Sequence, residues 1–138
     1  MKAFLDTDVI ISSLISKTGA ANYILNSPDI NSAVSNIALP EIHDVAKRLK
    51  IPKDRLRQLI GGRINVVNVK LNEGEIKKLY GKYTMDIDDA KIIGSAHKAK
   101  AKYLITYNLR HYKIDRIKEE LDFAVLSPAL FLQYLRSS

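Results

Sequence analysis

The stretch "FLDTDVII", residues 4–11, places two aspartates inside an otherwise apolar segment near the start of the chain. The apolar residues before Asp6 suffice only for a short buried strand, whereas those from Val9 onward suit the start of a helix. Asp6, Thr7 or Asp8 can each cap that helix. A charge at the end of a buried strand costs free energy unless it is paired or bound. The stretch therefore predicts a strand-to-helix junction and makes Asp6 a candidate for a role beyond capping.

Short apolar strands alternate with helical segments along the rest of the sequence. The predicted strands cover residues 3–5, 31–35, 64–69, 103–106 and 123–125, of which 64–69 fits an extended connection equally well. The predicted helices cover residues 9–15, 20–25, 40–49, 72–80, 86–99 and 114–121, with two more opening at Pro52 and Pro128. This alternation predicts an α/β fold whose parallel sheet is covered by helices on both faces.

Length and composition set the broad class of protein. The 138 residues suggest a single domain over residues 1–138, and the hydrophobic fraction of 46% is that of an ordinary globular protein. The absence of cysteine excludes disulfides, zinc–thiolate sites and thiol catalysis. No apolar run is long enough to span a bilayer, and Asp6 and Asp8 interrupt any signal-peptide core, so we expect a cytoplasmic protein without membrane contact. The net charge of +7 permits binding to a polyanion such as nucleic acid.

Polar residues gather at the expected carboxyl ends of the strands, where parallel α/β sheets bind ligands. These residues are Asp6 after the first strand, Ser35 at the end of the second, and Thr106 and Asn108 at or after the strand that begins at Tyr103. Glu41 and Asp89 lie early in the helices predicted to follow the second strand and Met85. If both helices begin at this edge of the sheet, we expect their carboxylates to converge with Asp6.

Converging carboxylates repel one another unless a cation neutralises them, and such hard oxygen ligands suit Mg²⁺ or Mn²⁺. A divalent ion held by carboxylates activates water and stabilises charge on a phosphodiester, so a basic protein with this site is a candidate nuclease. Each acid also has an ordinary structural interpretation. Asp86 and Asp89 fit a helix cap, and Glu41 fits a solvated acid in a first helical turn.

At these residues the sequence resembles the PIN-domain family. The matching elements are residues 4–9 (FLDTDV), Ser35 with Glu41, residues 89–96 (DAKIIGSA), residues 104–108 (LITYN) with Tyr112 just beyond, and residues 126–132. Each motif is short, but their order and spacing together are fairly specific. The resemblance extends over nearly the whole chain.

The resemblance implies a three-layer α/β/α fold with a central parallel sheet of about four to five short strands. It also implies an endoribonuclease dependent on Mg²⁺ or Mn²⁺, of the VapC-like toxin branch, with RNA as substrate and an antitoxin as partner. Carried over residue by residue, the catalytic acids and metal ligands would be Asp6, Glu41 and Asp89, with Asn108 as a further ligand. The supporting residues would be Thr7, Asp8, Asp86 and Thr106, which orient or assist those ligands.

Asn108 departs from the family pattern, because many members carry a fourth acid at this position. Asparagine supplies one neutral oxygen and no charge. We therefore expect one tightly bound metal ion, and a second only when substrate is present.

Basic residues flank the predicted site and are candidates for contacts with an RNA backbone. We select Arg110 and Arg48, with solubilising helix faces as the alternative interpretation. The histidines show no metal-binding spacing, so we assign His43, His97 and His111 to the surface or to packing. Apolar helix stripes leave open an antitoxin surface or a homodimer.

Other functions remain open from the sequence alone. A phosphatase of the haloacid-dehalogenase type would use Asp6 as nucleophile and Asp8 as acid/base, because "DTDV" resembles its opening. The absence of a Gly after the second Asp argues against it. An RNA-binding module with weak or no catalysis would keep the fold, and Asn108 is its main support. A receiver domain is a weaker alternative, because no phosphoacceptor Asp closes a middle strand.

Overall fold

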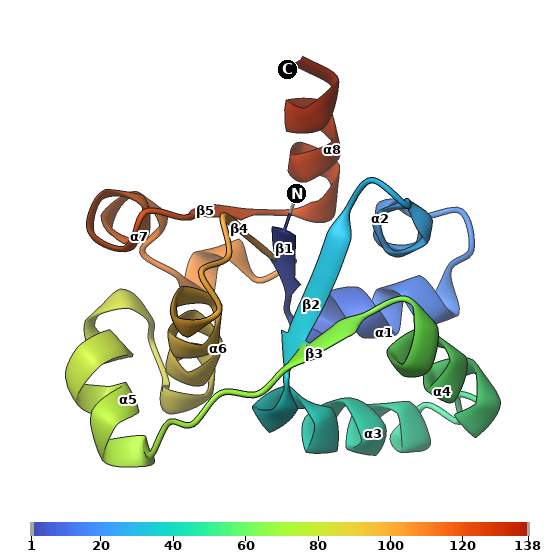
Figure 1. Ribbon diagram of the computed structural model, residues 1–138, viewed down its shortest axis with the longest axis horizontal. Helices are drawn as coiled ribbons and strands as arrows, with labels where there is room; N and C mark the ends of the chain where they lie inside the picture. The colour runs from blue at the N-terminus through green and yellow to red at the C-terminus, as the bar shows by residue number, and fades with distance from the viewer. Residues whose placement is uncertain (1, 138) are drawn as a thin grey trace.

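A five-stranded parallel sheet forms the centre of the computed structural model, which describes residues 2–137 (Figure 1). The strands are β1 (Lys2–Leu5), β2 (Asn31–Ser35), β3 (Asn65–Val67), β4 (Tyr103–Ile105) and β5 (Ala124–Leu126). Their order across the sheet is β3-β2-β1-β4-β5, so β1 lies in the middle between β2 and β4. This confirms the predicted parallel sheet of four to five short strands.

Helices cover both faces of the sheet. The first face carries α1 (Thr7–Ile15), α2 (Ala20–Asn26), α3 (Leu39–Arg48), α4 (Lys53–Gly62) and α8 (Pro128–Ser137). The second face carries α5 (Glu73–Tyr80), α6 (Ile87–Lys98) and α7 (Ile114–Leu121). Three short 3₁₀ helices complete the described elements: η1 (Asn36–Ala38), η2 (Gly81–Tyr83) and η3 (Leu109–His111).

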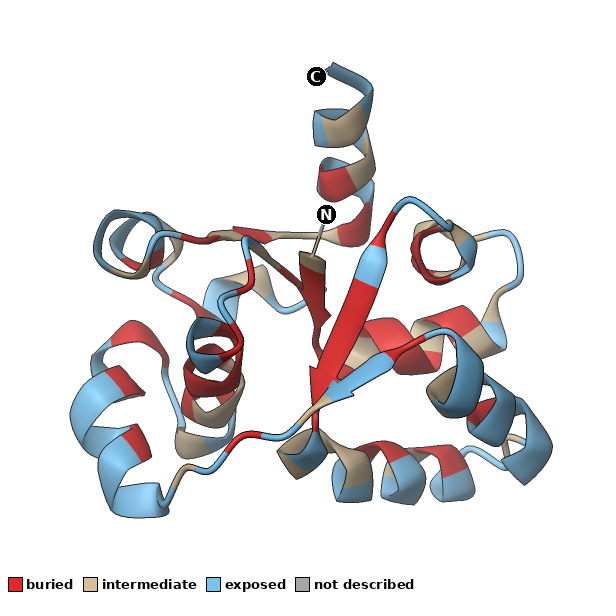
Figure 2. Cartoon of the chain, in the orientation of Figure 1, coloured by how far each residue is buried: buried red, intermediate tan, exposed pale blue. Residues whose placement is uncertain are grey.

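Two hydrophobic cores result from the alternation of side chains along the central strand. Ala3 and Leu5 of β1 belong to the core beneath α1 and α3, whereas Phe4 belongs to the core beneath α5 and α6. The central strands are buried on both sides, and the outward surfaces of the helices are exposed (Figure 2). The predicted three-layer α/β/α arrangement is therefore confirmed. No helix within residues 2–137 combines the length and apolar character needed to cross a bilayer.

Four of the five strands have boundaries that differ from prediction. β1 begins one residue earlier and β4 ends one residue earlier than expected, and two other strands change more. The predicted strand at 64–69 shortens to Asn65–Val67, which pairs only with β2 at the edge of the sheet. The last strand is Ala124–Leu126, one residue later than expected, because its register is fixed by pairing with Tyr103–Ile105. Pairing with the neighbouring strand determines both boundaries, and local sequence does not show that pairing.

Hydrogen bonding continues past the ends of the central strands. The backbone N–H of Asp6 donates to the carbonyl of Ile105 at 3.0 Å, and that of Thr106 donates to Leu126 at 3.0 Å. These bonds bring Asp6 and Thr106 to the same carboxyl edge of the sheet.

Gly94 sets how closely α6 packs against α5. A Cβ atom at this position would lie 2.9 Å from ring atoms of Tyr80, so a larger residue would push the two helices apart. Because α6 carries Asp89 in its first turn, this close packing also fixes where that acid stands.

Candidate active site

Asp6 occupies the junction between β1 and α1. It is the N-cap of α1: its Oδ1 accepts a hydrogen bond from the backbone N–H of Thr7 at 2.7 Å. Its Oδ2 accepts a bond from the hydroxyl of Thr106 at 2.8 Å. Burial raises the pKa of Asp6 above its ordinary value, although the hydrogen bonds from Thr106 and Thr7 act in the opposite direction. Asp6 is thus both a cap and a buried acid at the sheet edge.

Asp8 lies two residues further along, in the first turn of α1, and is held by the loop that follows β4. Its Oδ2 accepts hydrogen bonds from the backbone N–H of Tyr107 at 3.1 Å and from the Asn108 amide nitrogen at 3.0 Å. Burial, and next the negative charge of Asp6, raise the pKa of Asp8 to about 7. An increase of this size means that the metal-free site resists taking a second negative charge.

Asp86 and Asp89 begin α6 as a capping pair. Asp86 is the N-cap, and its Oδ1 accepts the backbone N–H of Asp89 at 2.9 Å, as the capping interpretation predicts. Asp89 is buried, and burial followed by the charge of Asp86 raises its pKa to about 6. Asp6 contributes to the same rise, which is consistent with electrostatic coupling of the two acids across the sheet edge.

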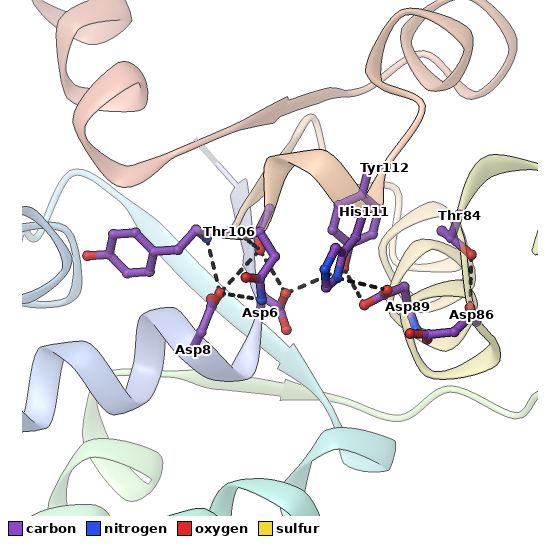
Figure 3. A network of polar contacts seen from close by, with 10 residues as sticks. Asp6, Asp8, Thr84, Asp86, Asp89, Thr106, His111 and Tyr112 are labelled. Atoms are coloured by element: carbon purple, nitrogen blue, oxygen red, sulfur yellow. Dashed lines mark hydrogen bonds and ion pairs between the residues drawn. The ribbon is translucent and has the colours of Figure 1, made fainter.

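Tyr112 lies between Asp6 and Asp89 and contacts both, and His111 contacts Asp89 (Figure 3). The Tyr112 hydroxyl lies 3.4 Å from Asp6 Oδ2 and 3.3 Å from Asp89 Oδ1, and His111 Nδ1 lies 3.2 Å from Asp89 Oδ2. From the sequence, His111 was expected at the surface or in packing and Tyr112 had no expected role, so neither contact was predicted. The available signal was position, because both residues follow the carboxyl end of β4.

Glu41 completes the acidic group from the first turn of α3. Burial raises the pKa of Glu41, and the charges of Asp6 and Asp88 raise it further. A cavity of about 480 Å³ brings the acids together, and Asn108 and His111 also line it. Its acidic lining residues are Asp6, Asp8, Glu41, Asp86, Asp88 and Asp89. Asp88 was not among the predicted site residues.

The other predicted residues have different surroundings. Thr106 makes the contact with Asp6 that an orienting residue would make. The Thr7 hydroxyl is buried and has no hydrogen-bond partner among residues 2–137, so it does not orient a ligand through a hydrogen bond here. Arg48 and Arg110 are exposed and lie outside the cavity lining.

The acids fit a hard divalent cation in donor type and charge. Within residues 2–137, no three carboxylate or imidazole groups already stand in a coordinating arrangement. However, the buried Asp8 Oδ1 accepts no hydrogen bond from these residues, and the buried Asp89 Oδ2 has only its 3.2 Å contact with His111 Nδ1. Buried carboxyl groups with raised pKa values and few hydrogen-bond donors around them are groups that a cation would stabilise. Side-chain rotation within the cavity is needed to close the ligands around an ion.

Comparison with known proteins identifies the family and the fold of the chain. The family model described as PIN domain matches residues 2–110. No curated protein matches the sequence significantly. A chain of a toxin–antitoxin complex from Klebsiella pneumoniae is similar with a TM-score of 0.68 and 23% identity, over 91% of this chain and 97% of the other.

Two further structures share the fold at 16% identity. One is VapBC2 from Rickettsia felis bound to a DNA fragment from their promoter, with a TM-score of 0.64 over 91% of this chain and 97% of the other. The second is VapC20 from Mycobacterium tuberculosis, a Sarcin-Ricin loop cleaving toxin, with a TM-score of 0.55 over 74% and 86%. Identities this low establish the fold alone, but the family model covers most of the sequence. The chain therefore belongs to the PIN-domain family, as its motifs indicated.

Proposed function

We propose that this protein is an endoribonuclease dependent on Mg²⁺ or Mn²⁺ and the toxin of a toxin–antitoxin pair. The observation that carries the proposal is the shared cavity: acids from the end of β1, the start of α3 and the start of α6 line one space. These acids are separated widely in sequence, and their individual capping roles do not require them to meet. The proposed unit is a single domain over residues 1–138.

The comparisons support the chemistry and the partner as well as the fold. The PIN-domain match covers the segments that carry all the proposed ligands. One similar structure is named as a toxin that cleaves the Sarcin-Ricin loop, and two others contain toxin–antitoxin assemblies. We therefore propose RNA as the substrate and an antitoxin as a protein partner. A homodimer remains a second proposed assembly.

Asp6, Glu41 and Asp89 would hold the cation, and Asn108 would offer its amide oxygen. When bound, such an ion activates water and stabilises negative charge on a phosphodiester. The amide nitrogen of Asn108 already donates to Asp8, so the amide oxygen is the atom that it can offer to a cation.

The remaining residues hold these groups in place. Thr106 orients Asp6, Asp86 caps the helix that carries Asp89, and Asp8 holds the loop that carries Asn108. Arg48 and Arg110 are exposed near the same region and would contact RNA phosphates, in keeping with the net charge of +7.

An RNA-binding module without turnover is the second candidate. The specific observation in its favour is that no three acids of residues 2–137 already coordinate as a group, together with a neutral Asn108. This candidate predicts RNA binding that neither Mn²⁺ nor Mg²⁺ converts into cleavage.

Cleavage assays on purified variants test the proposed function. We expect Asp6→Asn and Asp89→Asn to abolish Mn²⁺-dependent RNA cleavage while the protein remains folded. Asp115→Asn is the matched control, because Asp115 is also an acid in a first helical turn but is exposed and lies on α7, outside the cavity. Undiminished metal-dependent cleavage by both site variants would exclude this site, and RNA binding without cleavage by the unmodified protein would favour the binding module.

A further inference from the structure

Tyr112 is the one side chain within residues 2–137 whose hydroxyl contacts both Asp6 and Asp89. Its oxygen lies 3.4 Å from Asp6 Oδ2 and 3.3 Å from Asp89 Oδ1 (Figure 3). These two carboxylate oxygens cannot be further apart than the sum of those distances. His111 approaches Asp89 only, and Thr106 contacts Asp6 but not Asp89.

The backbone fixes the position of Tyr112 firmly. Tyr112 forms an isolated antiparallel bridge with Thr84, and the next residue, Lys113, donates its N–H to the carbonyl of Tyr83 at 2.9 Å. The ring is 5% exposed and belongs to the core beneath α6. The segment after β4 is therefore joined directly to the segment that leads into Asp86 and α6, so the hydroxyl does not depend on a mobile loop tip.

A neutral hydroxyl is suited to hold two acids that would otherwise repel each other. An ordinary phenol is uncharged at neutral pH and can donate one hydrogen bond. The hydroxyl has one proton, so it donates to one of the two carboxylates at a time and can alternate between them. A phenylalanine ring would fill the same space and offer neither contact.

We propose that Tyr112 is a positioning residue that holds Asp6 and Asp89 within reach of one shared divalent cation. The role rests on the proposed metal-dependent function and extends it to a residue outside the ligand set. Outer-shell partners of metal ligands commonly change metal affinity by about 10- to 100-fold when they are removed. Because both bonds of Tyr112 are long, we expect an effect at the lower end of that range.

Titration of residues 1–138 with MnCl₂, measured by isothermal calorimetry, tests this role. We expect Tyr112→Phe to bind Mn²⁺ about 10-fold more weakly than the unmodified protein. Tyr83→Phe is the matched control, because Tyr83 is equally buried and its hydroxyl donates to Glu120 at 3.0 Å, away from the ligands. We expect Tyr83→Phe to keep the Mn²⁺ affinity, and thermal melting shows whether both variants fold.

The dependence of cleavage on Mn²⁺ provides a second readout. We expect the loss of cleavage in Tyr112→Phe to appear at limiting Mn²⁺ and to disappear at saturating Mn²⁺, which a general packing defect would not do. Equal or tighter Mn²⁺ binding by Tyr112→Phe would overturn the role of Tyr112 while leaving the proposed function intact. Absence of Mn²⁺ binding by the unmodified protein would instead overturn the proposed function, and the role of Tyr112 with it.

Discussion

Two cavities lie on either side of α3, and they differ in size and in charge. The larger, of about 610 Å³, lies between α3 and α4 and has a mostly apolar lining with a basic rim formed by Lys47, Lys50, Lys53 and Arg57. The smaller, of about 480 Å³, lies at the carboxyl edge of the sheet and includes Glu41 and five aspartates but no lysine or arginine in its lining. Volume alone would select the larger cavity as the site. The chemistry of the lining selects the smaller one, because six carboxylates line it and none lines the larger cavity.

Removing one acid gives the largest expected contrast between the two cavities. Saturation at 100 times the dissociation constant stabilises a protein by about 2.7 kcal/mol, which corresponds to a rise in melting temperature of roughly 10 °C for this size. We expect MnCl₂ to produce such a rise in the unmodified protein and none in Asp89→Asn. Lys47→Gln, in the larger cavity, should keep the full rise. Loss of the rise in Lys47→Gln but not in Asp89→Asn would reverse the assignment of the two cavities.

Thr106→Val should lower the free energy of unfolding without changing the charge of the acidic cavity. Thr106 is fully buried and donates to Asp6, and a hydrogen bond to a charged group contributes about 1.5–3 kcal/mol to the free energy of unfolding. Thr7→Val is a matched control at the same edge, since the Thr7 hydroxyl is buried but has no hydrogen-bond partner within residues 2–137. Chemical denaturation of both variants checks this, and equal losses would mean that the Thr106 bond contributes nothing specific.

Stability should depend on pH in the direction set by the raised pKa values. Asp8 and Asp89 have folded pKa values of about 7 and about 6 against an ordinary value of 3.8. Their contribution to the free energy of unfolding is fully present below pH 3.8. It is lost as the pH rises from there through the folded pKa values of about 6 and about 7, because ionisation is disfavoured in the folded protein. We expect the metal-free protein to lose stability over this window and Mn²⁺ binding to strengthen over it.

Asp8→Asn isolates one contribution to this pH dependence. The variant should lose less stability than the unmodified protein between about pH 4 and pH 7, because one raised pKa has been removed. If both proteins lost the same stability across that range, the raised pKa of Asp8 would not contribute to the pH dependence.

The smallest expected effect concerns the basic residues. Arg48 is exposed on the last turn of α3, and its charge opposes the rise in the pKa of Glu41. In an inactive Asp6→Asn background, we expect Arg48→Gln to weaken RNA binding and to reduce the salt dependence by about 0.7 in log–log slope, the value for one contact to a single strand. Lys53→Gln, on the rim of the larger cavity, should leave the slope unchanged. Equal effects of the two substitutions would indicate general electrostatic attraction rather than a contact beside the acidic cavity.

The sequence predicted the helix caps and the short buried strands, because interactions between residues close in the chain determine them. Asn72 and Asp86 cap their helices through hydrogen bonds within three residues, and the buried strands are readable as short apolar runs. The convergence of Asp6, Glu41 and Asp89 followed from the rule that parallel strands present their carboxyl ends at one edge.

The residues that sequence reasoning missed depend on tertiary pairing. Tyr112 reaches Asp6 and Asp89 only because its backbone pairs with Thr84, and that pairing leaves no periodic signal in the sequence. His111 is the last residue of the short helix η3, whose three residues are too few to show an amphipathic pattern. In the sequence, Asp88 is one of several acids in the first turn of a helix. Only the fold shows that it lines the cavity together with Glu41.

A crystal of the protein soaked in MnCl₂ tests the central claim most directly. The acidic cavity should show an anomalous peak between the carboxylates of Asp6 and Asp89, with Glu41 turned toward it and the cavity between α3 and α4 empty of metal. A well-ordered cavity without such a peak at saturating Mn²⁺, or a peak held by other residues, would contradict the account.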